Sequence, residues 1–512
     1  HPLQSADPVD RHSIYNRCSH YYVTGCGQTA QPRRKCMRLS PVYDDLTSFD
    51  AEKRFPVLFL VLSVEVRFSP KRAKRDRFEL LKMLMAMIKP VSSLLLAVSC
   101  RGTASQQVWK LSRGRFRTQS CLGIAQARHA SFLTEEHDQL RDSVRRVIEN
   151  EINPRVDEWE EKGMYDKSFV LKKLAEIGAL GITKPTEYGG LGLDYSYNVP
   201  YLEELGMCKA GGVVTGVSVH TDMSTPALIR FGSDELKKLF LEPSIAGDML
   251  SCVGVSEPGA GSDVASIKTA AVRKGDDLVI NGTKMWITNG VQADWMCMLA
   301  NTRQDKPHKS KSLICVPMNL EGITVAQNIR KVGHWSSDTA QIFFEDVRVP
   351  ASYIIGEEGK GFLYQMMQFQ DERLAAALLV PNSMDRVIDD TIEYLRSRKA
   401  FKGTLLDKQY IQFTLAELKT EVEAVRSICY RAVEKMIEGE DATLLASMAK
   451  LKAARVSRTV TDSCLQFHGG MGYTHDMLIS RAWRDSRLLS IAGGADEIML
   501  YIISKFMGTC KD

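Results

Sequence analysis

The spacing of apolar residues changes twice along the chain, and this change constrains the fold more than any other feature. In residues 131–247, apolar side chains recur at three- and four-residue intervals, as at Leu140, Val144 and Ile148, which is the spacing of one helix face. Residues 248–350 contain short β-type runs, and helical spacing returns from about residue 358. This order predicts an α+β fold with an N-terminal α-helical domain (131–247), a middle β domain (248–357) and a C-terminal α-helical bundle (358–512).

Short patterns place individual elements within these regions. Thr134-Glu135-Glu136-His137 is typical of a capped helix start. Asn281-Gly282 separates Asp277–Ile280 from Lys284–Ile287 and predicts a β-hairpin, because both central residues of such a turn need positive φ. Gln341–Val349 predicts a further strand. Four long segments predict a four-helix bundle, namely Gly361–Val380, Met384–Arg398, Lys408–Glu438 and Thr443–Cys464.

The first 130 residues differ from the rest of the chain in charge. They hold 22 of the 67 Lys and Arg residues but only 9 of the 62 Asp and Glu residues, so the remainder is net acidic. A net acidic folded region argues against nucleic acid as a partner. Phe55–Val66 is apolar but too short to span a bilayer, and no transmembrane segment is predicted elsewhere.

Residues 87–130 have the composition of a mitochondrial transit peptide. They contain seven basic residues, six serines and no acidic residue, and such segments are rich in Arg and Ser and poor in acids. A disordered basic arm is the alternative. We expect translation to start at Met83, Met85 or Met87 and cleavage near Arg128–Ala130, which makes residues 1–86 a disordered upstream extension.

The cysteines do not predict a metal site. The seven Cys residues after position 130 are isolated, and no Cys-x-x-Cys pair or His/Cys cluster occurs. Scattered cysteines of this kind are typical of small buried side chains in a reducing compartment.

Four glycine-containing segments carry the chemistry. They are Ser256–Asp263, Met285–Gly290, Gln466–Tyr473 and Ile491–Glu497. None is a Gly-x-Gly-x-x-Gly strand–helix fingerprint, so a Rossmann nucleotide site is not predicted. The first is a loop with accessible backbone amides and the second ends a strand with an aromatic and a hydroxyl residue, which suggests a flavin site.

With these motifs in this order, together with Arg396–Phe401, the chain resembles the acyl-CoA dehydrogenase family over about residues 131–510. It is most similar to the long-chain type. The resemblance implies FAD as cofactor and a homotetramer, or at least a dimer, because Arg398 and Gln409 would reach FAD across a subunit interface. Two departures weaken the match at the cofactor: Ala495 replaces a usual Thr or Ser, and Lys402-Gly403 reverses the usual order.

The resemblance also implies which residues hold FAD and substrate. Val253, Val255, Ser256, Gly261 and Ser262 would line the flavin. Trp286 would cover its face, Thr288 would hydrogen-bond near N5, and Ile287 between them would also contact the cofactor. Gln466, Phe467, His468, Gly469 and Gly470 would hold the diphosphate, and Ala495, Asp496 and Glu497 would lie near the rest of the cofactor. Substrate contacts would come from Ser262, Leu363, Gln370, Asp371, Arg373, Gly493 and Gly494. Glycines suit a diphosphate because they allow close backbone approach.

The catalytic base is assigned from two positions: one where a carboxylate is usual but missing, and one where a carboxylate is found. Many family members carry it directly before the second glycine of the C-terminal loop, where this chain has Gly493. In the isovaleryl and long-chain types it lies in a Glu-Arg-Leu helix context, which Glu372-Arg373-Leu374 matches. Glu372 is therefore the expected base for α-proton abstraction. Neighbouring positions on a helix point about 100° apart, so Asp371 cannot share the role.

The resemblance implies FAD-dependent α,β-dehydrogenation of a medium- or long-chain fatty acyl-CoA to a trans-2-enoyl-CoA. This reaction would belong to β-oxidation in the mitochondrial matrix, with electron-transfer flavoprotein as partner. A short branched-chain substrate such as isovaleryl-CoA is the first alternative, because the isovaleryl-type enzymes also carry their catalytic base on this helix. A flavin-bearing scaffold without catalysis is the second, and Glu372 speaks against it.

Overall fold

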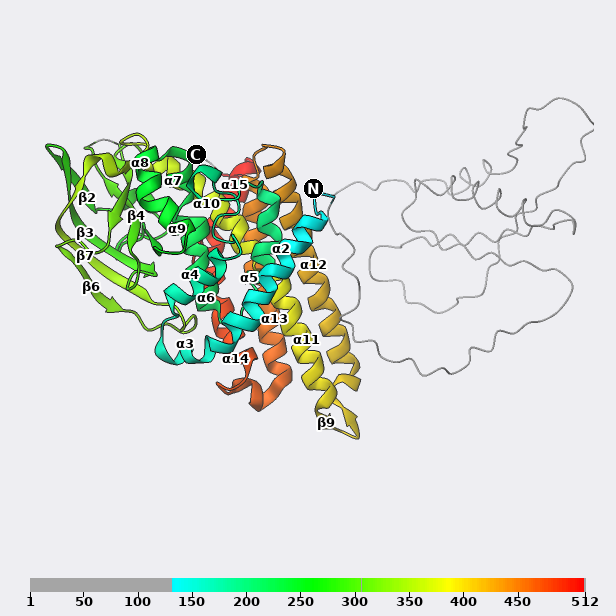
Figure 1. Ribbon diagram of the computed structural model, residues 1–512. Coiled ribbons are helices and arrows are strands. Elements are labelled where there is room, and N and C mark those ends of the chain that lie inside the picture. The colour runs from blue at the N-terminus through cyan, green and yellow to red at the C-terminus, as the bar shows by residue number, and fades with distance from the viewer. Residues whose placement is uncertain (1–130, 305, 511–512) are drawn as a thin grey trace, which may run out of the picture. The chain divides into compact units, whose positions relative to one another are not determined.

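The computed structural model describes residues 131–304 and 306–510, and these follow the order of helices, strands and helices (Figure 1). The predicted α+β class is therefore confirmed. The predictions for residues 1–86 and 87–130 lie outside the described residues. In the described part of the chain, no helix is both long and apolar enough to cross a membrane.

The first helix begins at the predicted cap. Helix α2 spans Glu135–Val147, and the backbone N–H of Thr134 donates to His137 Nδ1 over 3.1 Å. This contact satisfies one of the amides that a helix start leaves free. The following helices are α3 Val156–Lys162, α4 Lys167–Ala175, α5 Asn198–Leu205, α6 Gly211–Ser218, α7 Pro226–Phe231, α8 Asp234–Leu236 and α9 Glu242–Ile245.

The middle region is one eight-stranded sheet with the order β6-β7-β3-β2-β4-β5-β8, and β1 pairs with β4. Most pairs are antiparallel, whereas β4 runs parallel to β1 and β2. The strands are β1 Ser251–Gly254, β2 Ala270–Lys274, β3 Asp277–Thr288, β4 Trp295–Asn301, β5 Lys311–Pro317, β6 Ile323–Asn328, β7 Thr339–Pro350 and β8 Ile354–Ile355.

The predicted hairpin at Asn281-Gly282 is wrong. These residues lie inside β3 at an irregularity in its pairing with β7, and the turn between β2 and β3 is formed by Gly275-Asp276 instead. The Asn281 side chain exchanges two hydrogen bonds with Asp346 of β7, over 2.9 and 3.0 Å. Because Asn281 bonds across the sheet, the strand continues and the chain turns at Gly275, whose φ is +64°.

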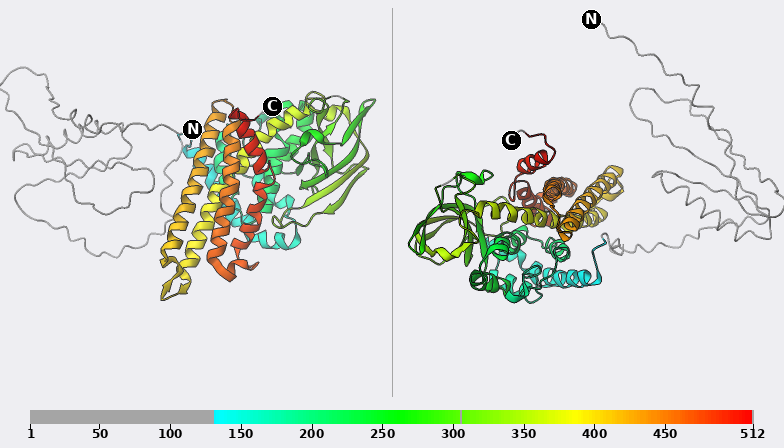
Figure 2. Two further views of the ribbon diagram at one scale, coloured as in Figure 1. Left: turned by 180° about the vertical axis from the view of Figure 1, so that it is seen from behind. Right: turned by 90° about the horizontal axis from the view of Figure 1, so that it is seen from above.

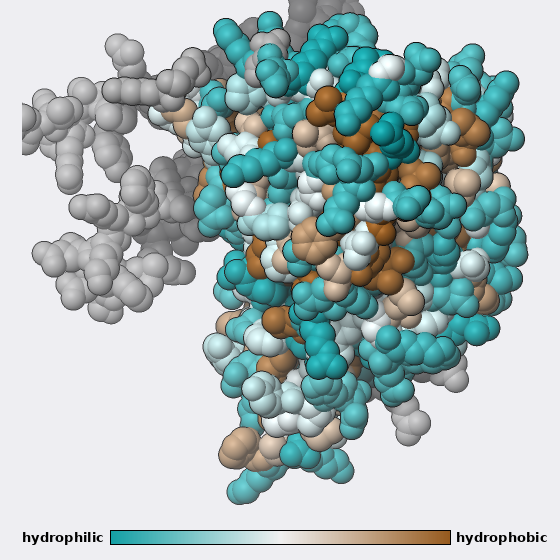
Figure 3. All heavy atoms as spheres, turned by 90° about the vertical axis from the view of Figure 1, so that its left-hand side faces the viewer, coloured by the Kyte–Doolittle hydropathy of each residue, from teal (hydrophilic) through white to brown (hydrophobic). Residues whose placement is uncertain are grey.

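Alternate residues of β4 belong to two different hydrophobic cores, one on each face of the sheet. Trp295, Cys297 and Leu299 pack with helix residues such as Leu228, whereas Met296 and Met298 pack with neighbouring strands. All five β4 residues are fully buried, which follows from the two-residue period of a strand covered on both faces. The sheet lies at one side of the described unit and the long helices lie at the other (Figures 1 and 2). The face at the left of Figure 1 is largely hydrophilic, with separate small hydrophobic patches (Figure 3).

The C-terminal region contains the four predicted long helices. They are α10 Gly361–Leu378, α11 Val380–Ser397, α12 Gln409–Ile437 and α13 Thr443–His468, followed by α14 Leu478–Ser486 and α15 Asp496–Phe506. Helix α11 starts four residues earlier than predicted because Pro381 occupies its first turn, where a missing N–H costs nothing. The short strands β9 Lys399–Ala400 and β10 Gly403–Thr404 join α11 to α12.

Asp485 of α14 ties the three regions together. Its carboxylate accepts the backbone N–H of Gly211 at the start of α6 over 3.0 Å. It also accepts the backbone N–H of His334, between β6 and β7, over 2.6 Å. One C-terminal side chain therefore holds both an N-terminal helix and a loop of the sheet.

Candidate active site

A buried ion pair holds the loop after β1 onto β3. Lys284 Nζ is fully buried and lies 2.9 Å from Glu257 Oε1. It also donates to the carbonyls of Val255 and Leu299 over 3.1 and 2.8 Å. Burial lowers the pKa of Lys284 to about 8, against the Glu257 charge. Ser256 lies between these anchors, and its carbonyl accepts the Met285 N–H over 2.9 Å.

The tip of this loop is open. Gly261 and Ser262 are exposed, and a Cβ atom on Gly259 or Gly261 would meet nothing within 4 Å. Val253 is half-buried and Val255 is buried. The predicted flavin residues therefore extend from β1 into a loop whose tip is exposed. Such a loop leaves backbone amides available to a ligand.

Trp286 stands in an unusual conformation beside that loop. Its φ is +65° and its side chain is 59% exposed, whereas Ile287 is buried and Thr288 is half-buried. A bulky residue with positive φ is rare and is held by its surroundings. The irregular pairing of β3 between Lys284 and Ile287 supplies that constraint and leaves the indole exposed.

The predicted diphosphate segment lies at the end of α13. Gly469 has a φ of +60°, and neither Gly469 nor Gly470 has an atom within 4 Å of an added Cβ. Gln466 is exposed and Phe467 is half-buried. His468 is buried, donates from Nδ1 to the Cys464 carbonyl over 2.8 Å and stacks on Tyr394.

The predicted interface residues Arg398 and Gln409 are both exposed. Tyr410, next to Gln409, makes an edge contact with Phe467 at 6.3 Å. The start of α12 therefore lies beside the predicted diphosphate segment of the same chain. That Arg398 and Gln409 reach FAD across a subunit interface stays a prediction.

Glu372 and Gly493 face each other. Glu372, on α10, is only 7% exposed, and a Cβ atom on Gly493 would lie 3.1 Å from its Oε1. Burial raises the pKa of Glu372 to about 7, although the charges of Arg373 and Lys450 oppose the shift. The φ of Gly493 is +62° and that of Gly494 is +89°, so glycine is favoured at both positions.

Asp371 points to different surroundings from Glu372, as its helix position predicts. Its carboxylate pairs with Arg230 of α7 over 2.7 Å. Burial raises the pKa of Asp371, while the Arg230 charge opposes that shift. Of the other predicted substrate residues, Leu363 is exposed, Gln370 is half-buried, and Arg373 is buried with no partner for Nε among the described residues.

Glu372 and Gly493 line a cavity of about 190 Å³. Its wall is mostly apolar and comes from distant segments, with Val214, Ala376, Leu379, Val387, Ala482 and Leu489 among its residues. A buried carboxylate at the wall of an apolar cavity can accept a proton from a carbon atom held there.

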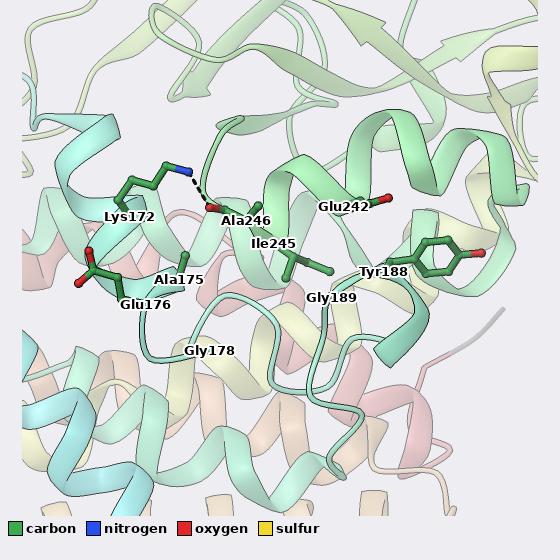
Figure 4. A pocket seen from close by; sticks show the side chains of 9 residues that line it. All are labelled: Lys172, Ala175, Glu176, Gly178, Tyr188, Gly189, Glu242, Ile245 and Ala246. Carbon is green, nitrogen blue, oxygen red and sulfur yellow. Dashed lines mark hydrogen bonds between the residues drawn. The ribbon is translucent and has the colours of Figure 1, made fainter.

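A larger cavity of about 430 Å³ lies between α4 and α9 (Figure 4). None of the predicted site residues lines it. Its Lys172 ammonium is already bonded to the Ala246 carbonyl over 3.0 Å and to Asp248. The region around Glu372 is therefore the candidate active site, because a titratable group with a shifted pKa, two glycines and an apolar cavity coincide there.

The last predicted cofactor residues begin α15. Ala495 is the cap residue and offers no side-chain hydrogen bond to the first turn. Asp496 is buried and Glu497 is exposed. Asp496 Oδ2 lies 3.4 Å from Arg455 Nε.

Sequence reasoning missed two charged residues near Glu372. Lys450 of α13 is fully buried, and the buried Asp222 is close enough to raise the pKa of Glu372. Lys450 occupies the same helix face as Ala446, Ala449 and Ala453. A charged residue on an apolar helix face is the sequence signal that could have identified it.

Three family models match consecutive parts of the chain. The N-terminal domain of acyl-CoA dehydrogenase matches residues 134–248, the middle domain 252–347 and the C-terminal domain 359–508. The long-chain specific acyl-CoA dehydrogenase of Rattus norvegicus is 34% identical over 77% of this chain and 91% of its own. The short-chain enzyme of the same species is also 34% identical, over 73% and 90%.

Solved structures agree with these matches. An acyl-CoA dehydrogenase from Geobacillus kaustophilus is 35% identical, with a TM-score of 0.70 over 74% of this chain and 99% of its own. The butyryl-CoA dehydrogenase of Megasphaera elsdenii is 31% identical, with a TM-score of 0.70 over 73% and 98%.

Proposed function

The chain belongs to the acyl-CoA dehydrogenase family, and we propose that it converts a medium- or long-chain fatty acyl-CoA to the trans-2-enoyl-CoA. It is an oxidoreductase that acts on the CH–CH bond of an acyl-CoA, and its cofactor is FAD. The chain length and the residue roles below are part of the proposal.

One observation carries the assignment of the base. Glu372 is a buried carboxylate at the wall of the apolar cavity and faces Gly493. Abstraction of an α-proton breaks a C–H bond and forms an O–H bond on Glu372. A base with a pKa of about 7 is well matched to this task at neutral pH. The charge that develops on the thioester oxygen needs a donor, and the Gly493 N–H is the candidate.

The residues present fit FAD. The open loop at Gly261 and Ser262, the exposed Trp286 and the open glycines Gly469 and Gly470 leave room for a large ligand. In the proposal, the loop and Trp286 hold the flavin ring, whereas the two glycines hold the diphosphate. When bound, FAD supplies the hydride acceptor for the β-carbon.

The preference for longer chains rests on two supports. The cavity is apolar along several helices, which suits a hydrocarbon tail. The long-chain enzyme of Rattus norvegicus is among the similar proteins. We further propose electron-transfer flavoprotein as the electron acceptor, a homotetramer as the assembly and the mitochondrial matrix as the location, because the similar Rattus proteins are named mitochondrial.

An anaerobic titration tests the proposal. The FAD-bound protein is mixed with butyryl-, octanoyl-, palmitoyl- or isovaleryl-CoA, and loss of the oxidised flavin absorbance is followed. Octanoyl- or palmitoyl-CoA should bleach the flavin fastest. Faster bleaching by isovaleryl-CoA would replace the proposal with the branched-chain alternative, and no bleaching by any thioester would favour a scaffold.

A further inference from the structure

Lys450 holds the loop that contains Gly493. Its Nζ donates to the carbonyls of Leu489 and Ala492 over 2.7 and 2.9 Å, and also to the carbonyl of Gly494. The side chain is fully buried. An ammonium group has three protons to donate, so all of them are used on one short loop.

These bonds fix the direction of the Gly493 amide. The peptide between Ala492 and Gly493 is trans, and the C=O and N–H of a trans peptide point to opposite sides. Because the Ala492 carbonyl points to Lys450, the Gly493 N–H points away from it. That N–H has no hydrogen-bond partner within residues 131–304 and 306–510, so it is free to serve a ligand.

Lys450 is also part of the charged surroundings of Glu372. Lys450 and Arg373 favour the ionised carboxylate, whereas burial and Asp222 oppose it. Burial lowers the pKa of Lys450 to about 8, and the charges of Asp496 and Glu372 oppose that shift. Below about pH 8 the lysine is charged, and above about pH 7 the glutamate is ionised. Both groups are therefore in their working forms near neutral pH.

We propose that Lys450 is a positioning residue for α-proton abstraction: it orients the Gly493 N–H toward the substrate thioester oxygen and stabilises the ionised Glu372. This inference rests on the proposed function. During the step the proton moves from the α-carbon to Glu372, and the negative charge that appears on the thioester oxygen is met by the Gly493 N–H. Lys450 touches neither atom and acts through the loop and through its charge.

The test compares Lys450→Met with Lys450→Arg in the FAD-bound full chain. In Lys450→Met, we expect kcat for octanoyl-CoA to fall by about 10²-fold, the loss typical of one misplaced oxyanion donor. The acidic limb of the pH profile should move up by about 1 unit, since an opposite charge has been removed. FAD content and KM should stay near those of the parent. Lys450→Arg, which keeps a cation and several donors, should retain the parent pH limb and recover most of kcat.

Lys452→Met is the matched control, because Lys452 lies on the same helix and pairs with Glu421 at the surface. If Lys450→Met does not accumulate with FAD, Lys450→Gln replaces it, and a shifted pH limb is again expected. An unchanged pH limb in the uncharged variant, or an equal loss in Lys450→Arg, would overturn the inference. Failure of the parent enzyme to turn over any thioester would instead overturn the proposed function.

Discussion

Gly493 lies so close to Glu372 that a Cβ atom added to it would be 3.1 Å from Glu372 Oε1. A glutamate side chain on residue 493 would therefore begin beside the Glu372 carboxylate. The loop and α10 are separated by more than a hundred residues in sequence, yet they address one point in the cavity. This relationship gives the base assignment a geometric test.

Removal of the carboxylate should stop catalysis without loss of FAD. Glu372→Gln keeps the size of the side chain but cannot accept the α-proton, so turnover should fall by about 10³-fold. The flavin absorbance of the purified protein and its steady-state rate with octanoyl-CoA measure the two properties. Glu393→Gln is the control, because Glu393 of α11 is exposed and pairs with Arg396 at the surface. Near-normal turnover in Glu372→Gln would refute the assignment.

Transfer of the carboxylate to the loop should restore part of the activity. In Glu372→Gly with Gly493→Glu, the new carboxylate begins near the position that the old one leaves. The recovery should be partial, because a φ of +62° costs a non-glycine residue about 1–2 kcal/mol. The double variant should exceed Glu372→Gly alone by at least about 10-fold in kcat, on the scale of general base catalysis. Equal rates for the two would show that the positions do not serve the same atom.

Glu372 should destabilise the folded enzyme above neutral pH. Its pKa is raised to about 7 from 4.5, so the folded state keeps a proton that the unfolded state releases between these values. The contribution of Glu372 to the free energy of unfolding is therefore at its full value below about pH 4.5. It falls by about 3 kcal/mol as the pH rises to about 7. Glu372→Gln does not titrate, so its Tm should exceed that of the parent by more at about pH 8 than at about pH 5. A constant difference in Tm would contradict the burial of the charge.

The buried Lys284–Glu257 pair under the loop after β1 should be sensitive to loss of one partner. Lys284→Met leaves the Glu257 charge buried and unpaired, which should cost about 3–5 kcal/mol and lower FAD content. The combined Lys284→Met and Glu257→Gln change should be milder. Arg273→Met removes a surface pair with Glu358 and should cost less than about 1 kcal/mol. Thermal melts and flavin absorbance compare the three, and equal effects would argue against a special role for the buried pair.

Local patterns predicted what local physics determines. The capped start at Thr134 follows from its local cap pattern, and the four long helices and the different directions of Asp371 and Glu372 follow from helix periodicity. The hairpin prediction failed because a side-chain bond between Asn281 and Asp346 keeps β3 extended, and such a distant contact leaves no local signal.

The cavity could not be predicted for a similar reason. Its wall combines Val214, Val387 and Ala482 from separate helices, and their meeting depends on tertiary packing. Lys450 could have been identified from the sequence, since a lysine on an alanine-rich helix face is unusual. Its three bonds to the segment before α15 were not foreseeable, because they join carbonyls about 40 residues away along the chain to a side chain of α13.

The carboxylate of Asp485, which accepts the Gly211 and His334 amides, bears on how this enzyme can be re-engineered. Asp485 also lines the cavity that Glu372 borders, so this cavity and the contact between the three regions share one residue. The three stretches that match separate family models are therefore not independent units that can be exchanged one at a time. A chimaera that takes residues 134–248 or 252–347 from a relative must keep the backbone amides of residues 211 and 334 within reach of Asp485, because the same side chain also lines the cavity.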